Sequence, residues 1–201
     1  MVPEPVAFYP LNAGYKAAQK ENRQPNGIVG DVSIANEPYN KPGGAYMFYG
    51  TVSSYIEFPN MGGLNTKTSL TLMCWVQSGG QDEPLISYGA QVQIWIDTRR
   101  FRLILDHRFR WSSKEVLPTE EWVHFAATYK HKRLSLFING RSSALHRFTF
   151  IRARSAIATN TVRTGVRDKD TRFFKGNIAE MKFYDVALND NQIQTSIIQG
   201  S

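Results

Sequence analysis

A single cysteine, Cys74, stands among the 201 residues of this chain. One thiol cannot form a disulfide within the chain, and it cannot supply the several cysteines of a structural zinc site. The four histidines show neither the HxxxH nor the HExxH spacing that places two imidazoles on one zinc ion. The sequence therefore excludes an internal disulfide framework and gives no support for zinc.

Long apolar runs are also missing. No stretch of about 18 apolar residues occurs, so the sequence predicts no membrane-spanning helix. The opening residues, MVPEPVAFYP, lack the basic segment and apolar stretch of a secretory signal, and no Asn-x-Ser/Thr sequon follows. These features leave the location of the chain to be inferred from other observations.

Acidic residues are scarce in the middle of the chain. Residues 99–172 hold 17 Lys/Arg against 6 Asp/Glu, whereas residues 1–98 hold 5 against 8 and residues 173–201 hold 2 against 3. The middle segment thus supplies all of the net charge of +7. This asymmetry predicts an anionic partner, and the alternative is a solubilising charge spread over all faces.

Alternation with a period of two dominates the sequence. Short runs rich in β-branched, aromatic and leucine residues recur, with turn residues between them. Asn139-Gly140 is the clearest hairpin signal among these turns. The runs cover residues 53–59, 68–77, 92–97, 101–106, 121–129 and 133–140. Short strands at close intervals predict a single all-β domain over residues 1–201, folded as a two-sheet antiparallel jelly-roll sandwich.

Two segments depart from this period. Residues 21–44 are rich in Pro, Gly and Asn, and we expect a long surface excursion there instead of a linker between domains. Near the end, isoleucines 193, 197 and 198 fall at helical spacing, with Asn189 or Asp190 as N-cap. The sequence therefore predicts one short C-terminal helix.

Large aromatic residues on the apolar faces of the expected strands are predicted to form the core. The prediction covers Trp75, Trp122, Phe125 and Phe137, because aromatic side chains bury more area than any other type. Cys74 is expected to fill space in the core as a small apolar residue.

Five segments follow one another in a characteristic order. They are VAFYPLN (6–12), GGAYMFYGTVSSYIEFPN (43–60), TSLTLMCWVQ (68–77), EWVHFAATYKHKRLSLFINGR (121–141) and FKGNIAEMKFYDVALNDNQI (174–193). Together they resemble the concanavalin A-like jelly roll of the laminin-G-like and pentraxin type over nearly the whole chain. The resemblance implies the same two-sheet fold and an extracellular or cell-surface binding module.

The resemblance also raises the question of calcium, which needs six to eight oxygen ligands. The family's calcium-binding Asp falls on Ala179 here, while Glu180 and Asp31 keep carboxylates nearby. A second, pentraxin-type site would fall on Asp168 and Asp170. No cofactor is required by this sequence, and calcium is an alternative expectation. Arg167, Lys169 and Arg172 around the second pair favour a basic hairpin turn instead, and Glu180, Asp185 and Asp190 are expected to end a strand and begin the helix.

Catalytic carboxylates are not evident. Glucanases that resemble this fold carry two or three acids at alternate positions of one strand, so that all face the cleft. Here Glu57 stands alone, and Ile178 and Lys182 occupy the positions flanking Glu180. The sequence therefore predicts a protein that is not an enzyme, with a diverged glycosidase as a remote alternative.

The basic segment supplies the candidate ligand contacts. Arginine forks match sulfate, carboxylate and phosphate, and alternate spacing places Arg100 with Arg102, and Arg152 with Arg154, on one strand face each. The resemblance to laminin-G-like modules implies a sulfated, glycosaminoglycan-like ligand for such a surface. The candidate ligand-binding residues are Arg100, Arg102, Arg110, Trp111, Lys130, Lys132, Arg133, Arg152 and Arg154.

Other partners remain open at this point. A lectin for neutral sugars would use aromatic residues such as Tyr88, Trp95 or Trp111 at the mouth of the concave face. An adhesion module without carbohydrate affinity would bind an extracellular protein or form a homo-oligomer. Nucleic acid is not expected, because no recognised nucleic-acid motif accompanies the charge.

Overall fold

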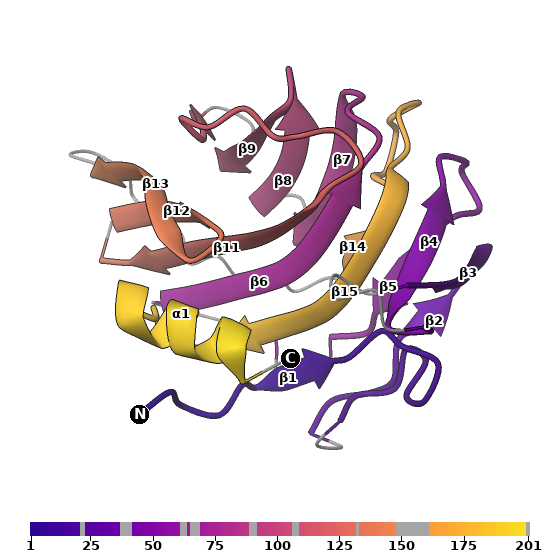
Figure 1. Cartoon of the computed structure of the whole chain (residues 1–201), viewed down its shortest axis with the longest axis horizontal. Helices are drawn as coiled ribbons and strands as arrows, with labels where there is room; N and C mark the ends of the chain where they lie inside the picture. The colour runs from indigo at the N-terminus through magenta and orange to yellow at the C-terminus, as the bar shows by residue number, and fades with distance from the viewer. Residues whose placement is uncertain are drawn as a thin grey trace.

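The structure is a computed structural model that describes residues 1–20, 23–36, 42–60, 64, 69–88, 92–105, 109–131, 133–147 and 161–199. Two antiparallel sheets contain all of its named strands (Figure 1). The eight-stranded sheet has the order β13 (Arg141–Arg147), β12 (Arg133–Ile138), β11 (Trp122–Lys130), β6 (Ser69–Ser78), β15 (Lys175–Tyr184), β4 (Ala45–Tyr49) and β3 (Val32–Ala35), with β1 (Ala7–Tyr9) paired to β15. The seven-stranded sheet has the order β10 (Phe109–Ser112), β9 (Arg100–Leu105), β8 (Val92–Asp97), β7 (Glu83–Tyr88), β14 (Val162–Thr164), β5 (Ile56–Phe58) and β2 (Ile28–Val29).

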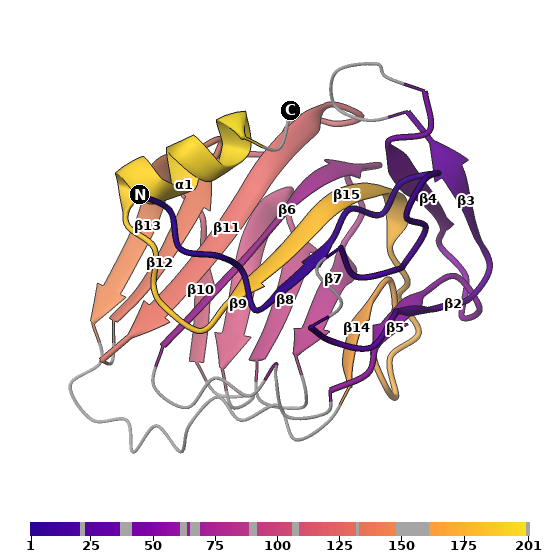
Figure 2. The same ribbon diagram turned by 90° about the horizontal axis from the view of Figure 1, so that it is seen from below.

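In the described ranges, one helix, α1 (Asp190–Ile198), lies against the outer face of the eight-stranded sheet (Figures 1 and 2). Asn189 caps it, because the Asn189 side chain accepts the Gln192 N–H at 3.0 Å and the Gln192 side chain accepts the Asn189 N–H at 3.0 Å. The predicted sandwich with one C-terminal helix is confirmed. No helix in the described ranges is long and apolar enough to cross a membrane.

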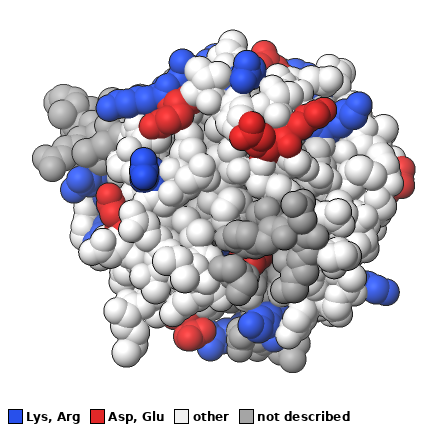
Figure 3. All heavy atoms as spheres, in the orientation of Figure 1, with Lys and Arg blue, Asp and Glu red and all other residues white. Residues whose placement is uncertain are grey.

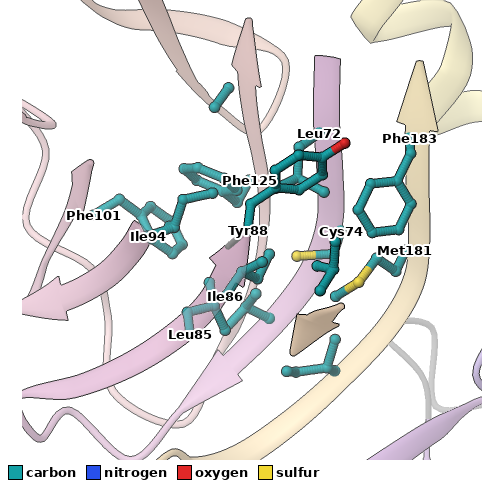
Figure 4. Packing of buried hydrophobic residues seen from close by; sticks show 14 of the residues in the cluster. Leu72, Cys74, Leu85, Ile86, Tyr88, Ile94, Phe101, Phe125, Met181 and Phe183 are labelled. Carbon is teal, nitrogen blue, oxygen red and sulfur yellow. The ribbon is translucent and has the colours of Figure 1, made fainter. Parts of the chain in front are cut away.

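The main core lies between the two sheets. Figure 4 shows Cys74 and Phe125 of the eight-stranded sheet pointing toward Ile94 and Phe101 of the seven-stranded sheet. The rings of Phe101 and Phe125 lie 4.5 Å apart, which joins the sheets through aromatic contact. Cys74 is fully buried, and burial raises the pKa of its thiol far above the usual range. The expectation that Cys74 fills space in the core is confirmed.

The prediction that all four aromatics form the core is wrong for two of them. Phe125 and Phe137 are buried, whereas Trp75 and Trp122 are only half-buried and belong to neither apolar cluster. In the sheet Trp75 pairs with His124, on the outer face, and their rings lie 5.2 Å apart. The run LTLMCWV of β6 is apolar on both faces, because α1 covers part of the outer face of the sheet. Its sequence therefore does not reveal which residues face the core.

The segment 21–44 is more regular than expected in its described part. It contains β2 and β3, which form edge strands of the two sheets. Both are short, and their exposed and half-buried residues do not alternate clearly, so the sequence pattern did not reveal them.

Candidate functional site

The outer face of the seven-stranded sheet carries a row of polar side chains. In β8, Val92, Ile94 and Ile96 point into the core, so Gln93 and Trp95 point outward. The strand register sets Gln93 opposite Ser87 of β7, and Ser87 opposite Arg163 of β14. The same register sets Trp95 opposite Arg102 of β9. We call this surface, defined by Ser87, Gln93, Trp95, Arg102 and Arg163, the polar face.

Three buried polar atoms of the polar face have no hydrogen-bond partner within the described part of the chain. They are Ser87 Oγ, Gln93 Oε1 and Trp95 Nε1. Gln93 is 4% exposed and Trp95 3% exposed, so neither side chain is turned to bulk water. An unpaired buried polar atom costs about 1–3 kcal/mol, and natural proteins keep few of them without a reason. Ser87 and Gln93 are cross-strand neighbours and Trp95 lies two residues further along β8, so the three unpaired atoms gather on one part of this face.

The loop between β14 and β15 covers Trp95 with two arginines. The guanidinium carbon of Arg172 lies 4.4 Å from the Trp95 ring centroid, and that of Arg167 lies 5.5 Å away. Asp170 joins the two arginines: it accepts Arg172 Nε at 2.9 Å and Arg172 Nη2 at 3.0 Å, and lies 3.6 Å from Arg167. The hydrogen bond from Arg172 is the main reason that the pKa of Asp170 is lowered.

Each arginine of the polar face also has an acidic partner. Arg102 pairs with Asp97, and Arg163 pairs with both Glu57, at 2.6 Å, and Asp168. Basic and acidic side chains accordingly alternate along the upper edge of the molecule in Figure 3, where Figure 1 shows β7, β8 and β9. The polar face is therefore rich in arginine and close to neutral.

The predicted ligand-binding residues on β9 and β10 belong to the seven-stranded sheet, and their surroundings differ. Arg100 donates to the carbonyls of Ser113 and Lys114, and Arg102 is engaged by Asp97. Arg110 is exposed on β10. Trp111 is partly buried and packs against the core.

The remaining described candidates form a separate surface on the eight-stranded sheet. Lys130 of β11 lies directly opposite Arg133 of β12, and Arg133 lies opposite Arg147 of β13. Lys130 and Arg133 are exposed, and among the described residues neither of them forms an ion pair. We call Lys130 and Arg133 the basic row. Lys132, Arg152 and Arg154 lie outside the described residues, so the predicted basic surface divides between two sheets.

The carboxylates predicted for calcium have other partners. Asp168 pairs with Arg163 and Asp170 with Arg172, while Glu180 lies 3.4 Å from Lys182 at a β-bulge of β15. Asp31 is exposed in the turn after β2. Among the described residues, no group of three or more His, Cys, Asp and Glu is placed to hold a metal ion. Calcium at these four positions stays a prediction.

One acid stands apart from the polar face. Glu83 is 1% exposed at the start of β7, and it accepts hydrogen bonds from Ser78 Oγ at 2.6 Å and Lys175 N at 2.9 Å. Burial raises its pKa to about 7, although both hydrogen bonds act in the opposite direction. Its place between β6, β7 and β15 gives it a structural role in joining the sheets.

The aromatics expected at the mouth of a sugar site are not open. Tyr88 is buried in the core, and Trp95 lies on the outer face of the seven-stranded sheet beneath Arg172. Sequence reasoning missed Ser87, Gln93 and Arg163. The alternation in VQIWID could have placed Gln93 beside Trp95, but pairing with Ser87 and Arg163 depends on strands far apart in sequence.

The comparisons with known proteins agree with this architecture. The family model of the concanavalin A-like lectin/glucanases superfamily matches residues 50–194, well over half of the chain. No curated protein matches the sequence. Among solved structures, domain 4 of AbnA, a GH43 extracellular arabinanase from Geobacillus stearothermophilus in complex with arabinotriose, has a TM-score of 0.74 at 16% identity, covering 97% of this chain and 98% of that one.

In two further solved structures, this chain matches only part of a longer chain. The receptor binding domain of botulinum neurotoxin C/D mosaic serotype has a TM-score of 0.76 at 12% identity, covering 97% of this chain and 51% of that one. Trypanosoma rangeli sialidase in complex with the inhibitor DANA has a TM-score of 0.74 at 16% identity, covering 96% of this chain and 33% of that one. At these identities the likeness concerns the fold.

Proposed function

The chain belongs to the concanavalin A-like lectin/glucanase superfamily, and we propose that it is a non-catalytic carbohydrate-binding domain that acts outside the cell or at its surface. The ligand lies on the polar face, and anionic glycans are preferred. The arabinanase domain of similar fold was solved with arabinotriose, which supports an oligosaccharide as the ligand class.

The unpaired atoms Ser87 Oγ, Gln93 Oε1 and Trp95 Nε1 are the observation that carries this proposal. A sugar hydroxyl both donates and accepts, so it can pair with the Gln93 oxygen, the Ser87 hydroxyl or the Trp95 N–H. Each bond gained on binding removes a cost that the free protein bears. Because Arg167 and Arg172 cover Trp95, binding requires Arg167, the more distant of the two at 5.5 Å, to shift with the ligand while Arg172 stays on the ring.

The anionic preference rests on the arginines and on the basic row. Arg102 and Arg163 border the unpaired atoms, while Lys130 and Arg133 stand directly opposite each other without an acidic partner described for them. Directly opposed like charges destabilise a strand pair, and a bound sulfate relieves that repulsion. We infer that a sulfated chain engages the basic row while its sugar rings, or those of another ligand, occupy the polar face.

The absence of catalysis is supported by the state of the carboxylates. Glu57, Asp97, Asp168 and Asp170 each pair with an arginine. Glu83, whose pKa is raised to about 7, is enclosed between strands. A glycosidase needs one protonated and one charged carboxyl facing the same bond.

Chromatography on heparin resin with and without EDTA, eluted by a salt gradient, tests the anionic preference, and an array of neutral glycans runs beside it. We expect retention beyond that of an unrelated protein of equal charge, unchanged by EDTA. Loss of retention in EDTA would instead assign calcium to the predicted acids. Passage at physiological salt together with an empty array would overturn the carbohydrate-binding function.

A second candidate function, self-association, rests on the edge formed by β2 and β3. Ile28 and Val29 are 52% and 40% exposed, and Ile34 is 43% exposed. Figures 1 and 2 both place these two strands at the same edge of the sandwich. An exposed apolar edge strand can pair with a second copy. Sedimentation velocity at rising concentration tests this: a growing sedimentation coefficient favours it, and a constant monomer value excludes it.

A further inference from the structure

We propose that Arg172, held over Trp95 by Asp170, receives the carboxylate of a uronic-acid sugar. This inference rests on the proposed function, since it names the sugar class taken by the polar face. It adds a specificity-determining residue in the β14–β15 loop, which the three unpaired atoms alone do not identify.

Two contacts fix the orientation of the Arg172 guanidinium. The Trp95 ring lies beneath it at 4.4 Å from ring centroid to guanidinium carbon. Asp170 occupies one edge, through Nε at 2.9 Å and Nη2 at 3.0 Å. The hydrogen bonds among the described residues leave Nη1 unused. The Arg172 side chain is nevertheless 52% exposed, so the edge that carries Nη1 is open to a ligand.

Such an arrangement suits a carboxylate. A guanidinium edge presents two parallel N–H donors that match the two oxygens of a carboxylate. Ordinarily a surface arginine loses side-chain entropy on forming this pair, but Arg172 is already ordered by Trp95 and Asp170. The ligand therefore gains a directed charge-assisted bond at little entropic cost.

Local charge favours one anionic group over several. Two positive groups, Arg167 and Arg102, surround Arg172. Three negative groups do so as well: Asp170, Asp97 and Asp82. The cluster is therefore near neutral and does not attract a densely sulfated chain by charge alone. A sugar with one carboxylate and several hydroxyls fits both Arg172 and the unpaired atoms of Ser87, Gln93 and Trp95.

The test compares three purified glycans by isothermal titration calorimetry: galacturonic acid oligomers, dextran sulfate and neutral dextran. For the wild-type protein we expect measurable binding of the galacturonate oligomers. Arg172→Lys keeps the charge but removes the fork, and galacturonate affinity should fall by about tenfold or more. Arg141→Gln, at an exposed position of β13 on the other sheet, should leave the galacturonate affinity unchanged.

Asp170→Asn separates positioning from plain charge. If Asp170 holds Arg172 in place, its loss should weaken galacturonate binding about threefold to tenfold, although the protein becomes more positive. Asp168→Asn removes the same charge from the same loop without touching Arg172, and it should leave affinity unchanged or raise it. Higher affinity in Asp170→Asn, or equal loss in both variants, would overturn the proposal.

Binding of the three glycans to the wild-type protein distinguishes the role of Arg172 from carbohydrate binding in general. Binding of dextran sulfate or neutral sugars without galacturonate binding would overturn the role of Arg172 and leave carbohydrate binding intact. Failure to bind any glycan, on the calorimeter or on the array, would overturn both. Thermal unfolding of each variant confirms that the loop substitutions leave the fold in place.

Discussion

The outer faces of the two sheets treat positive charge in opposite ways. On the polar face every arginine has an acidic partner, and Arg172 lies on Trp95. On the eight-stranded sheet, Lys130 and Arg133 face each other across the hairpin without a described acid. Paired arginines lose long-range field but gain fixed geometry, whereas unpaired ones attract anions at a distance and discriminate poorly. The polar face is thus suited to recognising a shape, and the basic row to gathering a charged chain.

Substitution of the outward-pointing tryptophans, Trp95 on one sheet and Trp122 on the other, should give the largest difference in the free energy of unfolding between the two faces. Trp95→Ala removes a side chain that is 3% exposed, so the free energy of unfolding should fall by about 3 kcal/mol. Trp122→Ala removes a half-buried ring from the other sheet, and the loss should be about 1 kcal/mol. Urea denaturation measures both, and equal losses would mean that the polar face is not sealed over Trp95.

The two sheets should also respond to pH in opposite directions. The pKa of Glu83 is raised to about 7 in the folded state, so stability is present below its unfolded value of 4.5 and is lost as pH rises through 7. The loss should amount to about 3 kcal/mol. In Glu83→Gln, whose amide mimics the protonated acid, this decline between pH 4.5 and 7 should disappear from urea denaturation curves.

His124, on the eight-stranded sheet, provides the reverse case. Burial, and then the charge of Lys182, lower its pKa from 6.5 to about 3. Its neutral form supports the fold above pH 6.5, and stability is lost as the pH falls from 6.5 toward 3. Between pH 4.5 and 6.5 the two slopes oppose each other, so the wild-type protein should be most stable in that range, and removal of Glu83 should leave a stability that rises with pH up to about 6.5. Glu83→Gln should retain the acid decline, and a variant that lost both would contradict the separate assignments.

Ser87→Ala should produce a smaller effect with an informative sign. The substitution deletes an unpaired buried hydroxyl, so stability should rise by up to about 1 kcal/mol while glycan affinity falls. Thermal unfolding and glycan titration on the same sample measure the two changes. A loss of stability would mean that Ser87 already has a partner in the free protein.

Charge removal on the basic row should produce the smallest change in stability. Lys130→Gln with Arg133→Gln relieves a directly opposed like-charge pair, so stability should rise by about 0.5 kcal/mol. Elution from heparin resin should move to lower salt, while binding of galacturonate oligomers stays the same. An unchanged elution position would show that the basic row takes no part in binding the sulfated chain.

Local sequence patterns were sufficient for the fold and for the helix. The period of two predicted the antiparallel sandwich, and the isoleucines at helical spacing, with Asn189 or Asp190 as N-cap, predicted the C-terminal helix. The sequence pattern did not predict that Trp75 lies on the outer face. Because α1 covers part of the outer face of β6, that face is apolar too, and β6 lacks the alternation of apolar and polar residues that would distinguish its two faces.

The polar face was harder to predict because it is a product of strand order. Ser87, Gln93 and Arg163 come from β7, β8 and β14. Arg163 joins the polar face only because the chain crosses over and inserts β14 between β7 and β5. The sequence predicted a basic hairpin turn around Asp168 and Asp170, but the stacking of Arg167 and Arg172 on Trp95 depends on a loop that folds back over a distant strand.

Titration of the ¹⁵N-labelled protein with galacturonic acid oligomers, followed by ¹H–¹⁵N correlation spectra, tests the central claim most directly. The account predicts that the largest shifts include the Trp95 indole N–H, the Gln93 side-chain amide and the backbone amides of the β14–β15 loop, with β11–β13 unaffected. Shifts confined to the basic row, or none at saturating ligand, would contradict the polar face as the glycan site.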